Sequence, residues 1–273
     1  MAGYQVKRAG GLQQTIPRQE SAILTEILPI LLILFLATLA RSTFGFGEAL
    51  IAVPLLALCL PLTVAAPLAV LVSITIAALV VAQDWRHIHL RSAGWLIGST
   101  VFGIPFGILL LQHGHPRAIK AALALAILAF AVYALTRNTP PAQPQNQPPT
   151  HEPRRWLIVA GFFAGVMGGA FGMNGPPLVL YGSLRRWSAR QFLATLQAYF
   201  LPASILGMAG YWRAGLWTRA VTHDYLLSLP VILPTVWLGR ILHHRIPARA
   251  FQKYVYLGLC AIGIILLLQT IRG

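Results

Sequence analysis

Glu48 is the acidic residue whose position points most directly to chemistry. Of the six acidic residues, it is the one we expect at membrane depth, and the other five are assigned to a tail, a linker or loops. An ionised side chain inside a membrane is costly and marks a functional site by default. Burial favours the protonated form of a carboxyl group, so Glu48 is a candidate carrier of a coupling proton. Arg41, one or two helical turns earlier, is expected either to pair with Glu48 or to attract an anion.

Two glycine-rich segments interrupt apolar runs, at Gly45-Phe46-Gly47-Glu48 and at Gly172-Met173-Asn174-Gly175-Pro176-Pro177. A helix that starts at membrane depth directs its free N–H groups and its positive dipole end at whatever lies beside it. Glycine allows close approach of the backbone, and proline is tolerated in the first helical turn. We therefore expect the two starts to cradle an anion together. The alternative is that these glycines only permit close helix packing.

Polar residues in other apolar segments complete the candidate site. Serine and threonine in membrane helices often bond to their own backbone, so each of them alone is a weak signal. The loop histidines lack carboxylate or cysteine neighbours at metal-ligand spacing, and no nucleotide-binding or nucleophile motif occurs. We therefore expect no metal, no cofactor and no catalytic residue. The predicted substrate-binding set is Gly45, Gly47, Glu48, Ser73, Thr75, Gly172, Asn174, Gly175, Pro176 and Gln197.

The composition indicates which elements must position these residues. Hydrophobic residues make up 57% of the chain, charged residues only 10%, and the mean hydropathy is +0.69. Soluble domains carry about 25% charged residues, and a membrane-spanning helix needs roughly 17–25 mostly apolar residues. The net charge of +15 is spread over short clusters between apolar runs, as in interfacial anchors, and does not suggest nucleic-acid binding. The sequence predicts an all-α integral membrane protein in the lipid bilayer.

Ten apolar segments define the organisation of the chain. We assign residues 1–21 to a polar tail, 22–136 to a first transmembrane repeat, 137–155 to a proline-rich linker and 156–273 to a second repeat. The first segment follows a long charged leader without a convincing cleavage site, so we expect it to be retained. The predicted segments are 23–40, 49–60, 62–83, 92–112, 117–136, 156–171, 175–184, 191–212, 220–242 and 250–270.

The two halves share an order of features that predicts a duplication. Phe44-Gly45 corresponds to Phe171-Gly172, and Trp85-Arg86 corresponds at the same offset to Trp212-Arg213. Each half also has one short segment directly after its glycine-rich motif. Such pseudo-symmetric repeats with short broken helices near mid-membrane are typical of secondary transporters. The distribution of Arg and Lys favours ten crossings with inverted halves, whereas re-entrant short segments would give eight.

These residues resemble the sulfite exporter family TauE/SafE. The resemblance lies in Gly45-Phe46-Gly47-Glu48 with the helix that leads to Pro54, in residues 161–172, and in residues 234–245 with the following Ile246-Pro247. It covers nearly the whole chain after the tail. The resemblance implies a transporter of sulfite, sulfonates or other small organic anions, driven by an ion gradient. The first break departs from the family pattern, because Phe44 and Phe46 separate the glycines and a carboxylate follows.

We therefore expect a secondary transporter, of exporter type, for a small anion such as sulfite, a sulfonate or another organic anion. A proton or a sodium ion is the expected coupling ion, a homo-oligomer is a further candidate assembly, and a bacterial inner membrane is the expected location. One alternative is a channel-like anion pore. The other is a membrane-embedded enzyme or assembly factor, which would need catalytic groups clustered at one membrane face.

Overall fold

The structure is a computed structural model, which describes residues 16–45, 47–84, 90–136, 154–184, 189–243 and 248–272. All regular secondary structure in these residues is helical, and every predicted apolar segment corresponds to a helix. The helices are α1 (Ile16–Phe44), α2 (Glu48–Cys59), α3 (Leu62–Asp84), α4 (Leu90–His113), α5 (Pro116–Thr136), α6 (Arg154–Phe171), α7 (Gly175–Leu184), α8 (Ala189–Arg213), α9 (Arg219–His243) and α10 (Ala248–Arg272).

The outer surface of the bundle is apolar, as a lipid environment requires. Large side chains such as Phe102, Phe106 and Trp237 are exposed, although exposure to water would be unfavourable for them. The prediction of an all-α membrane protein is confirmed. Six of the described helices contain a stretch long and apolar enough to cross a membrane: Ile27–Phe44, Leu62–Ala82, Gly94–His113, Pro116–Thr136, Arg219–Gly239 and Lys253–Ile271.

Two helices are much shorter than the others. Helix α2 has 12 residues and α7 has 10, which corresponds to about 18 and 15 Å at a rise of 1.5 Å per residue. The hydrocarbon core of a bilayer is about 30 Å thick, so neither helix fills a crossing by itself. The number of crossings, eight or ten, stays a prediction.

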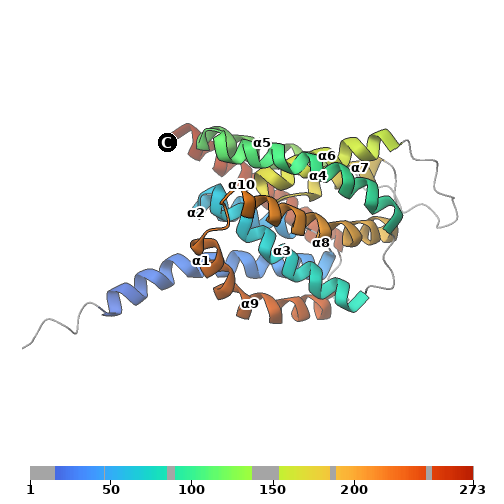
Figure 1. Cartoon of the computed structure of the whole chain (residues 1–273). Helices are drawn as coiled ribbons and strands as arrows, with labels where there is room; N and C mark the ends of the chain where they lie inside the picture. Colours follow the sequence, from blue (N-terminus) through green and yellow to red (C-terminus); the bar gives the residue numbers. More distant parts are fainter. Residues whose placement is uncertain are drawn as a thin grey trace, which may run out of the picture.

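The two halves of the chain pack against each other along paired helices (Figure 1). Helix α4 lies against α6 and α1 lies against α9, so each half contributes one helix to each pair. The α4–α6 contact is very close, because Gly103 and Gly107 on α4 face the backbone of α6, and Gly165 and Gly169 on α6 face the backbone of α4. Small residues at a spacing of four are the usual device for such contacts in membranes. Helix α5 packs against α10, α8 packs against both α3 and α4, and α3 also contacts α9.

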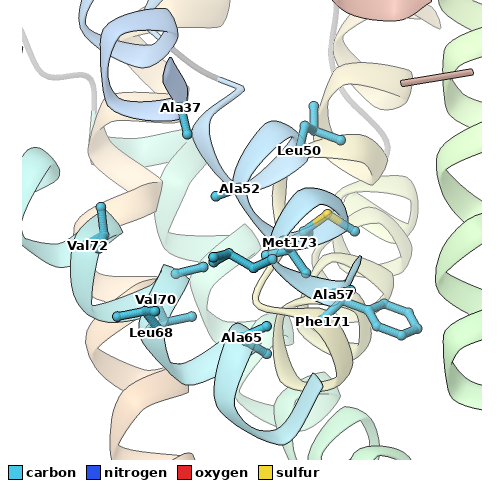
Figure 2. Close-up of a cluster of buried hydrophobic side chains, with 14 of the residues drawn as sticks. Ala37, Leu50, Ala52, Ala57, Ala65, Leu68, Val70, Val72, Phe171 and Met173 are labelled. Carbon is cyan, nitrogen blue, oxygen red and sulfur yellow. The ribbon is translucent and has the colours of Figure 1, made fainter. Parts of the chain in front are cut away.

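The apolar core surrounds α2 and joins it to both halves (Figure 2). Leu50, Ala52 and Ala57 of α2 pack in one cluster with residues of α1 and α3. Phe171 and Met173, at the end of α6, belong to the same cluster and are buried. The start of α2 is therefore held in a fixed place between the two halves.

Two predicted boundaries differ from the helix starts in the structure. Helix α1 begins at Ile16, inside the predicted tail, and residues 1–15 lie outside the described residues. Glu26 and Asp224, which we assigned to the tail, linker or loops, lie within α1 and α9. Glu26 is one residue before the apolar stretch Ile27–Phe44, and Asp224 lies inside the stretch Arg219–Gly239. Helix α6 begins at Arg154, within the predicted linker, of which residues 137–153 lie outside the described residues.

Candidate functional site

Helices α1 and α6 end in the same way. Gly45 has φ 82° and Gly172 has φ 67°, a left-handed conformation that glycine adopts without steric cost. The N–H of Gly45 donates to the carbonyl oxygen of Arg41 at 2.6 Å, and the N–H of Gly172 donates to that of Gly168 at 2.8 Å. A left-handed glycine that bonds four residues back is a standard helix C-terminus. We call residues 45–47 and 172–174 the first and second break; residue 46 lies outside the described residues.

The first break places a carboxyl group at the start of a helix. Gly47 has φ 99° and caps α2, and its carbonyl oxygen accepts the N–H of Ile51 at 3.2 Å. Glu48 is the first residue of α2. The positive end of the helix dipole favours a negative charge at this position.

Arg41 and Glu48 form a buried ion pair. Nη1 of Arg41 lies 3.0 Å from Oε2 of Glu48, and their side chains are 3% and 0% exposed. Nη1 also donates to Oγ of Ser73 on α3 at 3.0 Å. The guanidinium carbon lies 4.7 Å from the centre of the Phe200 ring on α8, within the range of a cation–π interaction. Four helices therefore meet at Arg41, three from the first half of the chain (α1, α2 and α3) and one from the second (α8).

The ion pair leaves polar atoms of both partners unsatisfied. Within the described residues, Nε and Nη2 of Arg41 and Oε1 of Glu48 are buried without a hydrogen-bond partner. Oγ1 of Thr38, one turn before Arg41 on α1, is also buried and unpaired there. Buried polar groups in proteins are nearly always hydrogen-bonded. The unpaired atoms on this turn of α1 and on Glu48 therefore make this place the candidate site for a polar ligand.

The second break carries no charged side chain. The side chain of Asn174 lies against Gly168, where a Cβ atom would overlap its Oδ1. The carbonyl oxygen of Gly168 also accepts the hydroxyl of Tyr211 at 2.9 Å. Gly175 is the first residue of α7, and Pro176 is buried in its first turn. The two charged side chains of the candidate site, Arg41 and Glu48, thus both lie beside the first break.

The predicted site residues are brought together only in part. Arg41, Glu48 and Ser73 are in direct contact. Thr75 bonds instead to the carbonyl oxygen of Leu71 and to the hydroxyl of Tyr225 on α9, at 3.1 and 2.7 Å. Gln197 belongs to α8, and its side chain lies outside the described residues.

Two residues at this site were missed from the sequence. Thr38 carries no distinguishing signal among the other hydroxyl residues of α1. Phe200 has one: it follows Ser73 by the same 127 positions (200 − 73) that separate Phe44 from Phe171 (171 − 44). The two residues that hold Arg41 from α3 and α8 therefore occupy equivalent places in the proposed repeats.

A nearby pocket has a different character. It has a volume of about 230 Å³ and lies between α1, α2, α9 and α10. In the part of its lining that the structure describes, Thr43 supplies the one hydroxyl group and there is no charged side chain, so it suits an apolar chain better than an anion. Among the described residues, no group of three His, Cys, Asp or Glu side chains comes together to hold a metal ion.

An apolar helical bundle with broken helices and a buried ion pair is typical of membrane transporters. The sequence model of the sulfite exporter TauE/SafE family matches residues 30–266. The chain belongs to this family, which confirms the resemblance noted in its glycine and proline motifs. It is therefore a multi-pass membrane transporter and not an enzyme.

A relative from Cupriavidus necator, named "Probable sulfite/organosulfonate exporter TauE", is 23% identical to the chain over 261 residues. The similarity covers 93% of this chain and 98% of that protein. No solved structure matches the chain.

Proposed function

We propose that this chain is an ion-coupled secondary transporter that exports a small sulfur-containing anion, such as sulfite or an organosulfonate, across a bacterial inner membrane. Its family and the name of its relative support this substrate class. The observation that carries the proposal is the buried guanidinium of Arg41, which has two nitrogen atoms without a partner among the described residues.

The chemistry of the guanidinium group fits such a substrate. Nε and Nη2 lie on one edge and present parallel N–H groups, the arrangement that binds two oxygen atoms of an oxyanion at once. Sulfite and sulfonates carry at least two such oxygen atoms on one sulfur atom. Within the described residues, Glu48 and Ser73 occupy only Nη1, so the other edge is available to the substrate.

The place of the site suits alternating access. In transporters built from two repeats, the substrate lies between the repeats beside broken helices, and one repeat moves relative to the other. Arg41 and Ser73 belong to the first half of the chain and Phe200 to the second. A relative movement of α3 and α8 would therefore open or close the surroundings of Arg41.

Counterflow in proteoliposomes tests the proposal. Vesicles loaded with unlabelled sulfite or an alkanesulfonate are diluted into a trace of the labelled anion, with sulfate and a simple carboxylate as comparison substrates. A transporter accumulates the label transiently inside the vesicles. Each unlabelled anion that leaves brings the binding site back to the outside, where it binds a labelled anion and carries it in. Uptake that does not saturate and shows no counterflow would indicate a channel. Absence of flux for every anion, from correctly folded protein, would refute the substrate class.

A further inference from the structure

We propose that Glu48 is a built-in counter-anion that the substrate displaces from Arg41, and that the displaced carboxylate takes up a proton, so that one proton moves with each singly charged anion. This inference rests on the proposed function and adds the coupling ion and the coupling step.

The ion pair is arranged for displacement. Glu48 is bound to Arg41 through one oxygen atom, Oε2, and one nitrogen atom, Nη1. Its second oxygen, Oε1, has no partner among the described residues. A structural Arg–carboxylate pair usually forms two parallel hydrogen bonds, which add both energy and geometric specificity. Glu48 thus makes one hydrogen bond to Arg41 and also interacts with the Ser73 hydroxyl. A substrate that takes two N–H groups of Arg41 competes effectively with that one bond.

Arg41 has supports that do not depend on Glu48. Ser73 accepts a hydrogen bond from Nη1 at 3.0 Å, and the Phe200 ring lies 4.7 Å from the guanidinium carbon. These contacts come from α3 and α8, whereas Glu48 comes from α2. The guanidinium can therefore stay in place while Glu48 leaves.

Charge balance links the anion to the proton. The pair as it stands is neutral, and in the described part of the chain Arg41 and Glu48 are the only buried side chains that carry a charge. A singly charged anion on Arg41 would leave a net negative charge in a region of low dielectric constant, which is strongly unfavourable. Protonation of Glu48 restores neutrality. The proton enters from the aqueous phase on the loading side and leaves from Glu48 on the opposite side.

The coupling must act in both directions. If the bound anion favours protonation of Glu48, a protonated Glu48 favours the anion by the same factor. Helices α1, α3, α5, α7 and α10 pack against α2, and in the described part of the chain Arg41 is the one charged group that interacts with Glu48 from them. The other titratable side chains described on these helices are Arg117, Lys120 and Tyr133 on α5, Tyr181 on α7, and Lys253, Tyr254, Tyr256 and Cys260 on α10.

Proton movement during transport of an alkanesulfonate tests this inference. A sulfonate stays ionised over the working pH range, so it carries no proton of its own, unlike sulfite. Proteoliposomes with an internal pH dye are exposed to an inward sulfonate gradient. We expect the interior to acidify by one proton for each sulfonate taken up, and the rate to be independent of an imposed membrane potential, because the transported pair is neutral.

Glu48→Gln identifies the proton carrier. Its amide can neither take up nor release a proton, so we expect the sulfonate uptake that remains to proceed without acidification beyond that of protein-free vesicles, and to become sensitive to the membrane potential. Asp224→Asn makes the same chemical change at an acidic residue that pairs with His223 on α9, and it should keep the acidification.

The outcomes separate the two proposals. Sulfonate uptake by the wild-type protein without acidification, or acidification that persists in Glu48→Gln, overturns the coupling inference and leaves the transporter proposal intact. Absence of sulfonate and sulfite flux in the wild type overturns the proposed function itself. Should Glu48→Gln not fold, the wild-type stoichiometry and its dependence on voltage still decide whether a proton accompanies the anion.

Discussion

At the scale of single residues, the costly feature of this protein is the buried pair of Arg41 and Glu48. Removing both charges from water costs several kcal/mol, and a buried ion pair rarely repays this cost in stability. The cost is higher here because three of their polar atoms have no partner within the described residues. A pair retained under these conditions is more readily explained by binding than by stability.

Variants that remove one or both of these charges should differ in stability. Arg41→Gln leaves Glu48 as a buried charge without its partner, and should lower the free energy of unfolding by about 3–5 kcal/mol unless Glu48 becomes protonated. The double variant Arg41→Gln/Glu48→Gln removes both charges and should be close to the wild type or more stable. Thermal unfolding in detergent measures both. A double variant less stable than either single variant would show that the pair is structural.

The sequence made some of these residues predictable and not others. Glu48 and Arg41 stand out because charged residues are rare in apolar segments, and their proximity follows from the short interval between them. Phe200 has only its offset from Ser73 as a signal, because aromatic residues are common in membrane helices and its contact with Arg41 depends on how α8 lies against α3. Thr75 was included for its residue type alone, and its bond to Tyr225 depends on the position of α9.

At the scale of helices, the two breaks differ in how closely their surroundings approach. A Cβ atom on Gly47 would meet nothing within 4 Å, whereas one on Gly172 would lie 2.9 Å from the carbonyl oxygen of Ala66 and 3.2 Å from a methyl group of Val70. Both glycines have positive φ. The second break is thus held against α3 by direct backbone contact.

Alanine substitutions should show this difference. Gly47→Ala should cost about 1–2 kcal/mol, the penalty of a left-handed conformation. Gly172→Ala adds a steric conflict with the backbone of α3 and should cost clearly more, since overpacking typically adds about 1–3 kcal/mol. Their unfolding temperatures, compared in one detergent, test this order. Equal effects would argue against the close contact between the second break and α3.

The pair α4–α6 permits a matched comparison within one helix. A Cβ atom on Gly107 would overlap the carbonyl oxygen of Val166, while one on Gly98 would meet nothing within 4 Å. Gly107→Ala should therefore separate the helices and destabilise the protein by about 1–3 kcal/mol. Gly98→Ala should be neutral or stabilising by up to about 1 kcal/mol, because alanine favours the helix. A Gly107→Ala protein as stable as Gly98→Ala would contradict the close packing.

The existence of the long helices was predictable because membrane-spanning helices need a long apolar run. Their ends were less so, since α1 begins at Ile16 and the predicted segment begins at residue 23. The pairing of α4 with α6 and of α1 with α9 was not predicted. Hydropathy indicates that a helix faces lipid or protein, but it does not indicate which other helix it contacts. The spacing of glycines on α4 and on α6 indicates that each helix makes a close contact, but it does not indicate which helix is the partner.

At the scale of the whole molecule, the contacts between the halves are extensive. Four helix pairs, α1–α9, α3–α8, α4–α6 and α5–α10, each join one half of the chain to the other. We expect these contacts, and not the covalent connection between α5 and α6, to hold the molecule together.

Cleavage of the connection tests this organisation. A protease site inserted within residues 137–153 should allow complete cutting without loss of transport, and the two fragments should elute together in detergent. An uncut protein with the same insertion is the control. Separation of the fragments after cutting would contradict the proposed assembly of two intertwined repeats.

Calorimetric titration of the purified protein with an alkanesulfonate measures whether Arg41 binds the anionic substrate. The wild type should bind one sulfonate per chain. The double variant Arg41→Gln/Glu48→Gln removes both charges, so no buried charge is left without its partner. Its affinity for the sulfonate should be lower by at least about tenfold, because loss of one charge-assisted hydrogen bond costs about 1.5 kcal/mol. Unchanged binding by a folded double variant would show that Arg41 does not bind the substrate.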